Sequence, residues 1–203
     1  KIKFAALAAA VLANLMRRQR DAVSLTCFND HVVSQSDVKS STTHYRTIIN
    51  QLQKVLLDSP KGSNTDVSKV IDGIAEQIHR RSLVVILSDM FENSENNEAL
   101  FSALQHLKFR KHEVIVFHIT DGDTEGNFNF DNRPYKFVDS ESGEELKLYP
   151  DDVREIYLKR MQQFKSELKL KCNQYRIDFV EADARKDFDQ ILLPFFSKRS
   201  KMR

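Results

Sequence analysis

The stretch Leu83-Val-Val-Ile-Leu-Ser-Asp89 decides the fold, because five apolar residues in a row end in a serine and an aspartate. An uninterrupted apolar run of this length is typical of a strand that is covered on both faces in a parallel sheet. Residues 114–119 form a second run of this kind, and leucines at helical spacing in 100–107 separate the two. Parallel strands joined by helices predict an α/β, three-layer, Rossmann-like fold.

Weaker patterns extend this alternation in both directions. We expect one domain over residues 1–203, with a hairpin insertion at about 126–149. The predicted helix from Asp152 begins with a capping-box-like Asp152-x-x-Glu155, and its apolar side chains are expected to line a buried face: Val153, Ile156, Tyr157, Phe164 and Leu168. The other predicted elements are helices at 4–15, 45–56, 67–78 and 188–196, strands at 23–28, 32–33 and 177–180, and hairpin strands at 135–138 and 146–148.

Composition excludes several classes of protein. The 203 residues include 31 Lys and Arg against 29 Asp and Glu, so the formal net charge is only +2. This balance argues against a strongly basic nucleic-acid binder, and we read the basic end at 198–203 as solvated. Two cysteines, Cys27 and Cys172, cannot build a disulfide scaffold or a four-cysteine zinc site. The apolar start of the chain is too short to span a bilayer, so we expect a cytoplasmic portion without a membrane anchor.

Candidate binding residues follow the strands, because ligands of open α/β sheets bind beyond the carboxyl ends of the strands. Asp89 is the most suggestive of them, although it could simply cap the turn into the next helix. The string Asp121-Gly-Asp-Thr-Glu-Gly126 resembles the start of a calcium loop. A strand precedes it and Asn132 stands where a closing Glu is needed, which predicts a solvated loop instead. No glycine-rich phosphate loop occurs, and the six histidines lack zinc-site spacing.

Several strings together resemble the von Willebrand factor A-like domain of a bacterial family of uncharacterised proteins, the domain of unknown function numbered fifty-eight. Genes of this family often lie beside genes for MoxR-type AAA+ ATPases. The matching segments cover nearly the whole chain. They are Arg20-Asp-Ala-Val-Ser-Leu-Thr-Cys-Phe28, Asn64-Thr-Asp66, Leu83-Val-Val-Ile-Leu-Ser-Asp89, His112-Glu-Val-Ile-Val-Phe-His-Ile-Thr-Asp121, Lys136-Phe-Val-Asp-Ser-Glu-Ser-Gly143, and the closing helix with Tyr157 and the later Cys172.

This resemblance implies an incomplete metal-ion-dependent adhesion site. Thr65 and Asp89 match the Thr and the Asp of that site, and Met90 stands where many A domains have Gly. The D-x-S-x-S loop that supplies the other ligands is missing, and in the family it lies just before the first helix. We therefore expect an N-terminally truncated chain without the first, central strand. It would hold no metal by itself, while the intact protein could bind Mg²⁺.

Two functions of different classes are consistent with these features. The resemblance favours a non-enzymatic protein-interaction module that partners a MoxR-type AAA+ ATPase in the assembly or maturation of other complexes. The alternative is a Mg²⁺-dependent hydrolase or phosphotransferase that uses Asp89, Asp121 and Asp123. Because the missing strand would leave apolar faces uncovered, we also expect self-association or strand exchange.

Overall fold

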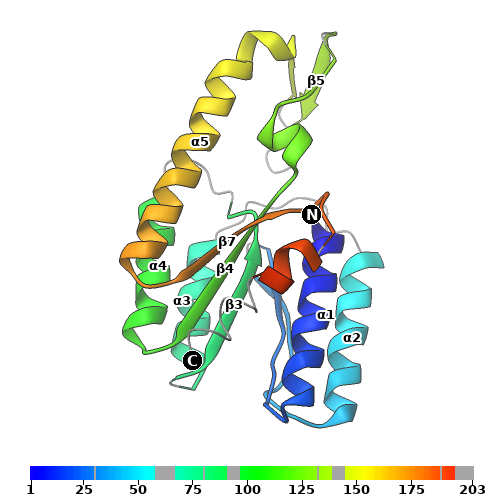
Figure 1. Cartoon of the computed structure of the whole chain (residues 1–203), viewed down its shortest axis with the longest axis vertical. Helices are drawn as coiled ribbons and strands as arrows, with labels where there is room; N and C mark the ends of the chain where they lie inside the picture. The colour runs from blue at the N-terminus through cyan, green and yellow to red at the C-terminus, as the bar shows by residue number, and fades with distance from the viewer. Residues whose placement is uncertain are drawn as a thin grey trace.

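Three parallel strands form the main sheet of the chain (Figure 1). The structure, a computed structural model, describes residues 1–29, 31–57, 67–79, 81–90, 97–131, 133–138, 145–187 and 189–194. The strands are β3 (Leu83–Ser88), β4 (Glu113–Thr120) and β7 (Asp178–Asp183), in the order β3-β4-β7. Helices flank the sheet on both faces, which confirms the predicted α/β, three-layer, Rossmann-like architecture.

One face of the sheet is covered by α1 (Ile2–Arg18), which packs side by side with α2 (Thr42–Leu57) (Figure 1). Alternate residues of a strand point to the same face, so the β4 residues Ile115, Phe117 and Ile119 lie in one buried cluster with residues of α1. The buried cluster on this face consists of Phe4, Ala8, Ile115, Phe117, Ile119, Ala182, Ile191 and Leu192. The last two belong to residues 189–194, which are helical.

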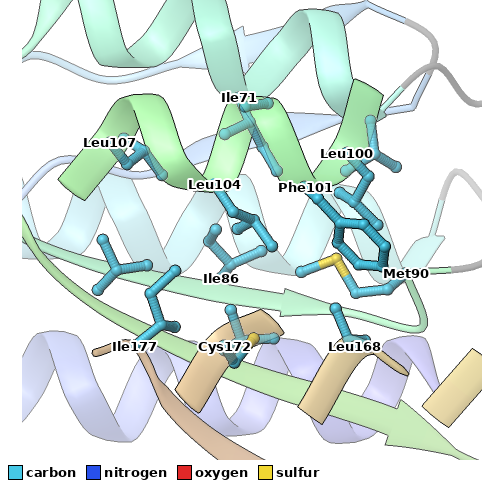
Figure 2. Close-up of a cluster of buried hydrophobic side chains, with 14 of the residues drawn as sticks. Ile71, Ile86, Met90, Leu100, Phe101, Leu104, Leu107, Leu168, Cys172 and Ile177 are labelled. Atoms are coloured by element: carbon cyan, nitrogen blue, oxygen red, sulfur yellow. The ribbon is translucent and has the colours of Figure 1, made fainter. Parts of the chain in front are cut away.

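The opposite face carries α3 (Val67–Gln77), α4 (Asn97–Phe109) and α5 (Pro150–Gln174). Figure 2 shows how α4 and α5 meet over β3, with Ile86 between them. Ten side chains of this cluster are labelled there: Ile71, Ile86, Met90, Leu100, Phe101, Leu104, Leu107, Leu168, Cys172 and Ile177. Cys172 is a buried free cysteine, and burial raises the pKa of its thiol to about 12, so it is an unreactive core residue.

The described residues also form two antiparallel strand pairs, each a two-stranded sheet of its own. β1 (Thr26–Phe28) pairs with β2 (Val32–Gln35), so the strand predicted at 23–28 is shorter than expected. β5 (Tyr135–Val138) pairs with β6 (Glu145–Leu148), which confirms the predicted hairpin. The β5–β6 hairpin and the first turns of α5 stand beyond the end of the main sheet (Figure 1).

The expected start of α5 is wrong. The helix begins at Pro150 rather than at the predicted capping box, and Tyr149 precedes it without a side-chain cap. Proline suits the first helical position because its missing N–H has no partner within a helix. Of the side chains expected to be buried, Leu168 is fully buried, whereas Ile156 is 59% exposed because the first turns of α5 lie beyond the sheet.

The expectation that β3 is covered on both faces is also only partly right. Ile86 is buried, but Leu83 is 41% exposed and the other residues of β3 are half-buried. The cause is the position of the strand, since among the described residues β3 has a neighbouring strand on one side only, β4. β4, with neighbours on both sides, is buried from Val114 to Ile119.

Candidate functional site at the carboxyl edge

Acidic residues collect where the three parallel strands end. Asp89 follows β3, Asp121 follows β4, and Asp183 is the last residue of β7. The sequence predicted this position for the first two. It missed Asp183, because the strand expected at 177–180 continues for three further residues.

Lys1 connects two of the acidic groups at this edge. Its Nζ donates to Asp89 Oδ2 at 2.7 Å and to Glu125 Oε1 at 2.5 Å. The side chains of Lys1, Asp89 and Glu125 are 35%, 41% and 25% exposed, so water reaches all three in part. Partial burial works against the charged form, but the hydrogen bonds and charges of Asp89 and then Glu125 outweigh it and raise the pKa of Lys1. The ammonium is therefore the stable state of this side chain.

The string singled out as calcium-loop-like folds as a short π-helical turn, η1 (Gly122–Gly126). The Asp121 carboxylate accepts hydrogen bonds from the backbone N–H of Asp123 at 3.0 Å and of Thr124 at 3.2 Å. The pKa of the Asp121 carboxyl is lowered by these two hydrogen bonds and by the neighbouring Arg185, and the bond from Thr124 has the largest effect. In return the backbone N–H of Asp121 donates to Glu125 Oε2 at 3.0 Å. The acidic residues here serve to build the turn.

Arg185 joins this turn to the end of β7. Its Nε lies 3.0 Å from Asp121 Oδ1, and its Nη1 forms an ion pair with Asp123. Asp183 Oδ1 accepts from the backbone N–H of Gly122 and of Arg185, both at 3.1 Å. A Cβ on Gly122 would lie 2.5 Å from Asp183 Oδ2, so a larger residue at this position would force the Asp183 carboxylate to move away from the backbone N–H of residue 122.

Met90 turns the chain sharply at the end of β3. Its φ of 52° lies in the left-handed region, which costs a non-glycine residue about 1 kcal/mol. Its side chain is completely buried in the cluster of Figure 2, and its backbone N–H donates to Ser88 Oγ at 3.0 Å. These contacts offset the strain and fix the backbone next to Asp89.

The predicted site residues come together only in part. Asp121 and Asp123 share Arg185, whereas Asp89 binds Lys1, and Glu125 connects the two groups. The predicted ligand Thr65 lies outside the described residues. Sequence reasoning assigned no role here to Lys1 or Arg185, because nothing in a linear sequence shows that their long side chains reach back to this edge.

The described residues do not fit a divalent cation. Nowhere in that part of the chain do three or more His, Cys, Asp or Glu side chains lie where they could hold a metal ion. Both predicted carboxylate groups have basic partners instead, as the distances at Lys1 and Arg185 show.

None of the helices in the described residues combines the length and the apolar character that crossing a bilayer requires.

Comparison with known proteins identifies the family of the chain. Residues 1–167 match the family described as "Protein of unknown function DUF58". No curated protein and no solved structure matches the sequence. Because the family match extends over well more than half of the 203 residues, the chain belongs to the DUF58 family.

Proposed function

We propose that this chain is a von Willebrand factor A-like, non-enzymatic interaction domain, which contacts a partner protein through the carboxyl edge of its sheet. The proposed partner is a MoxR-type AAA+ ATPase, and the proposed role is the assembly or maturation of other complexes. Membership of the DUF58 family and the α/β fold support this proposal. A cytoplasmic location is part of it, because an AAA+ ATPase needs ATP.

The observation that carries the proposal is a charged edge that solvent can reach. The side chains of Asp89, Asp123 and Arg185 are 41%, 45% and 51% exposed, and each is held in place by an ion pair. Charged groups at the rim of an interface steer the encounter of two proteins and exclude wrong partners. A partner can use such a fixed pattern of charges for recognition without any change in the fold.

The alternative of a Mg²⁺-dependent hydrolase or phosphotransferase stays a prediction. Its three carboxylates, Asp89, Asp121 and Asp123, would have to converge on an ion for metal-assisted hydrolysis. In the structure they divide between two basic side chains, so the geometry favours the interaction domain.

Binding to a purified MoxR-type ATPase from the same organism tests the proposal. We expect the double variant Asp89→Asn, Asp123→Asn to weaken this binding at least tenfold in calorimetry, because it removes charge from the edge. The control is Asp72→Asn, Glu76→Gln, which also removes two carboxylates, but from the pair that binds His106 between α3 and α4. The proposal fails if the ATPase does not bind the wild-type chain, or if both double variants weaken binding equally.

We also propose that this chain self-associates or exchanges a strand at the open edge of β3. Within the described residues β3 pairs with β4 alone, and it carries no charged residue to protect its other edge. Exposed edges of apolar strands recruit further strands, because their backbone N–H and C=O groups lack partners. Leu83, 41% exposed, marks the accessible end of this strand.

Sedimentation velocity tests this association. We expect the wild-type chain to sediment as a dimer or a larger species, and Leu83→Lys to sediment as a monomer, because lysine protects a strand edge. The matched control Leu193→Lys places the same charge at a leucine that is 63% exposed but lies outside β3. A monomeric wild-type chain, or loss of association in the control as well, contradicts the proposal.

A further inference from the structure

We propose that the Lys1 ammonium is a built-in counter-ion for Asp89 and Glu125, and that this edge of the sheet therefore stays assembled without a divalent cation. The inference concerns the same carboxyl edge of the sheet as the proposed interaction. It shares only this location with the proposed function. It runs against the metal dependence that an A-type adhesion site would imply for Asp89.

The first argument is the position of Lys1 between three elements. It stands at the start of α1, Asp89 follows β3, and Glu125 lies in the η1 turn that follows β4. A lysine ammonium is a compact charge with three donors, and two of them are used here, at 2.7 and 2.5 Å. Lys1 is thus a positioning residue that ties α1 to two neighbouring strand ends.

The second argument is that both carboxylates are held where the ammonium needs them. Glu125 binds Lys1 with one oxygen and the backbone N–H of Asp121 with the other. Asp89 directly precedes the backbone turn that the buried Met90 fixes. Without Lys1, two negative charges would face each other with no cation between them, an arrangement that repels.

The third argument is that the described residues at this edge offer a divalent cation no free set of ligands. Mg²⁺ requires near-octahedral oxygen ligands at about 2.0–2.1 Å. To reach Asp89 and Glu125 it would have to displace Lys1, and the nearby carboxylates of Asp121 and Asp123 are already paired with Arg185. In the described part of the chain, no group of three metal-binding side chains exists to replace them.

Thermal unfolding of the 203-residue chain, with and without millimolar Mg²⁺ or Mn²⁺, tests the inference. We expect neither ion to change the Tm of the wild type, and Mn²⁺ relaxation measurements to show no binding. Lys1→Met should lower the Tm by about 2–4 °C, the shift that corresponds to losing a partly exposed charge network in a chain of this size. Lys1→Arg keeps the charge and should restore most of that loss.

The matched control is Lys3→Met, which removes an exposed lysine from the same turn of α1. It should leave the Tm within about 1 °C of the wild type, as surface changes away from specific contacts do. A rise of the wild-type Tm with Mg²⁺, Mn²⁺ bound by the wild type, or equal effects of Lys1→Met and Lys3→Met would overturn the inference. None of these measurements involves the ATPase, so failure of the proposed function is distinguishable from failure here.

Discussion

Leu168→Ala is expected to lower the free energy of unfolding by about 2–5 kcal/mol, the range for truncating a fully buried leucine. Leu168 has no exposed surface and lies in the cluster where α4 and α5 meet over the sheet (Figure 2). α5 has 25 residues and buries only Pro150, Leu168 and Cys172 fully, while Phe164 packs half-buried against the same cluster. Removing one of them leaves a cavity that the neighbouring residues cannot fill.

The matched control is Leu170→Ala, which makes the same change in the same helix at a side chain that is 56% exposed. It should cost less than about 0.5 kcal/mol, because little apolar contact is lost. The measurement is urea unfolding monitored by circular dichroism. When the dependence of the unfolding free energy on urea concentration is the same in both variants, the difference between their midpoint urea concentrations gives the difference in stability. Equal losses in both variants would show that α5 is not seated on the sheet through Leu168.

The fold was predictable because its strongest signals are local. The apolar run of β3, the one in β4 and the helical spacing between them determine a parallel sheet with helices on its faces. The start of α5 was not predictable from a capping pattern, because two patterns only two residues apart indicate different starts. Asp152-x-x-Glu155 indicates a start at Asp152, whereas the proline indicates a start at Pro150. Likewise, no local pattern shows that β3 lies at the edge of the sheet rather than in its middle.

The site was predictable only as a location. The rule that ligands bind beyond the carboxyl ends of strands placed Asp89, Asp121 and Asp123 at one edge. Their partners were not predictable, because Lys1 and Asp89 are 88 positions apart and Arg185 and Asp123 are 62 apart. Which cation neutralises which carboxylate depends on how the elements pack. These ion pairs decide whether the carboxylates at this edge are already neutralised or are free to bind a metal ion.

Two buried histidines should make the protein lose stability in mild acid. His112, directly before β4, and His118, near its end, are each 1% exposed. Among the described residues no ring nitrogen of either histidine makes a well-formed hydrogen bond, and the backbone groups of Ser82 and Asp89 near the two rings offset their burial only in part. The His118 ring stacks on the Phe179 ring, with 5.9 Å between the ring centroids. It also makes an edge contact with the Phe164 ring, with 6.2 Å between the centroids. In both histidines, burial lowers the pKa below the usual value of about 6.5.

The direction of the effect follows from proton binding. Well above pH 6.5 both rings are neutral in the folded and unfolded states, so stability there does not depend on them. Below about pH 6.5 the unfolded chain takes up protons that the folded chain does not. The free energy of unfolding then falls by up to about 1.4 kcal/mol per pH unit for each histidine, until the pH reaches the lowered pKa.

The double variant His112→Phe, His118→Phe should therefore lose most of this slope in urea unfolding between pH 7.5 and 5. At pH 7.5 its stability should stay within about 1 kcal/mol of the wild type, because an apolar ring replaces a buried polar ring that makes no well-formed hydrogen bond. The control His79→Gln replaces an exposed histidine and should keep the wild-type slope. An unchanged slope in the double variant would mean that these rings are hydrated or protonated within the folded protein, and that carboxylates with a lowered pKa, such as Asp121 and Glu181, cause the slope instead.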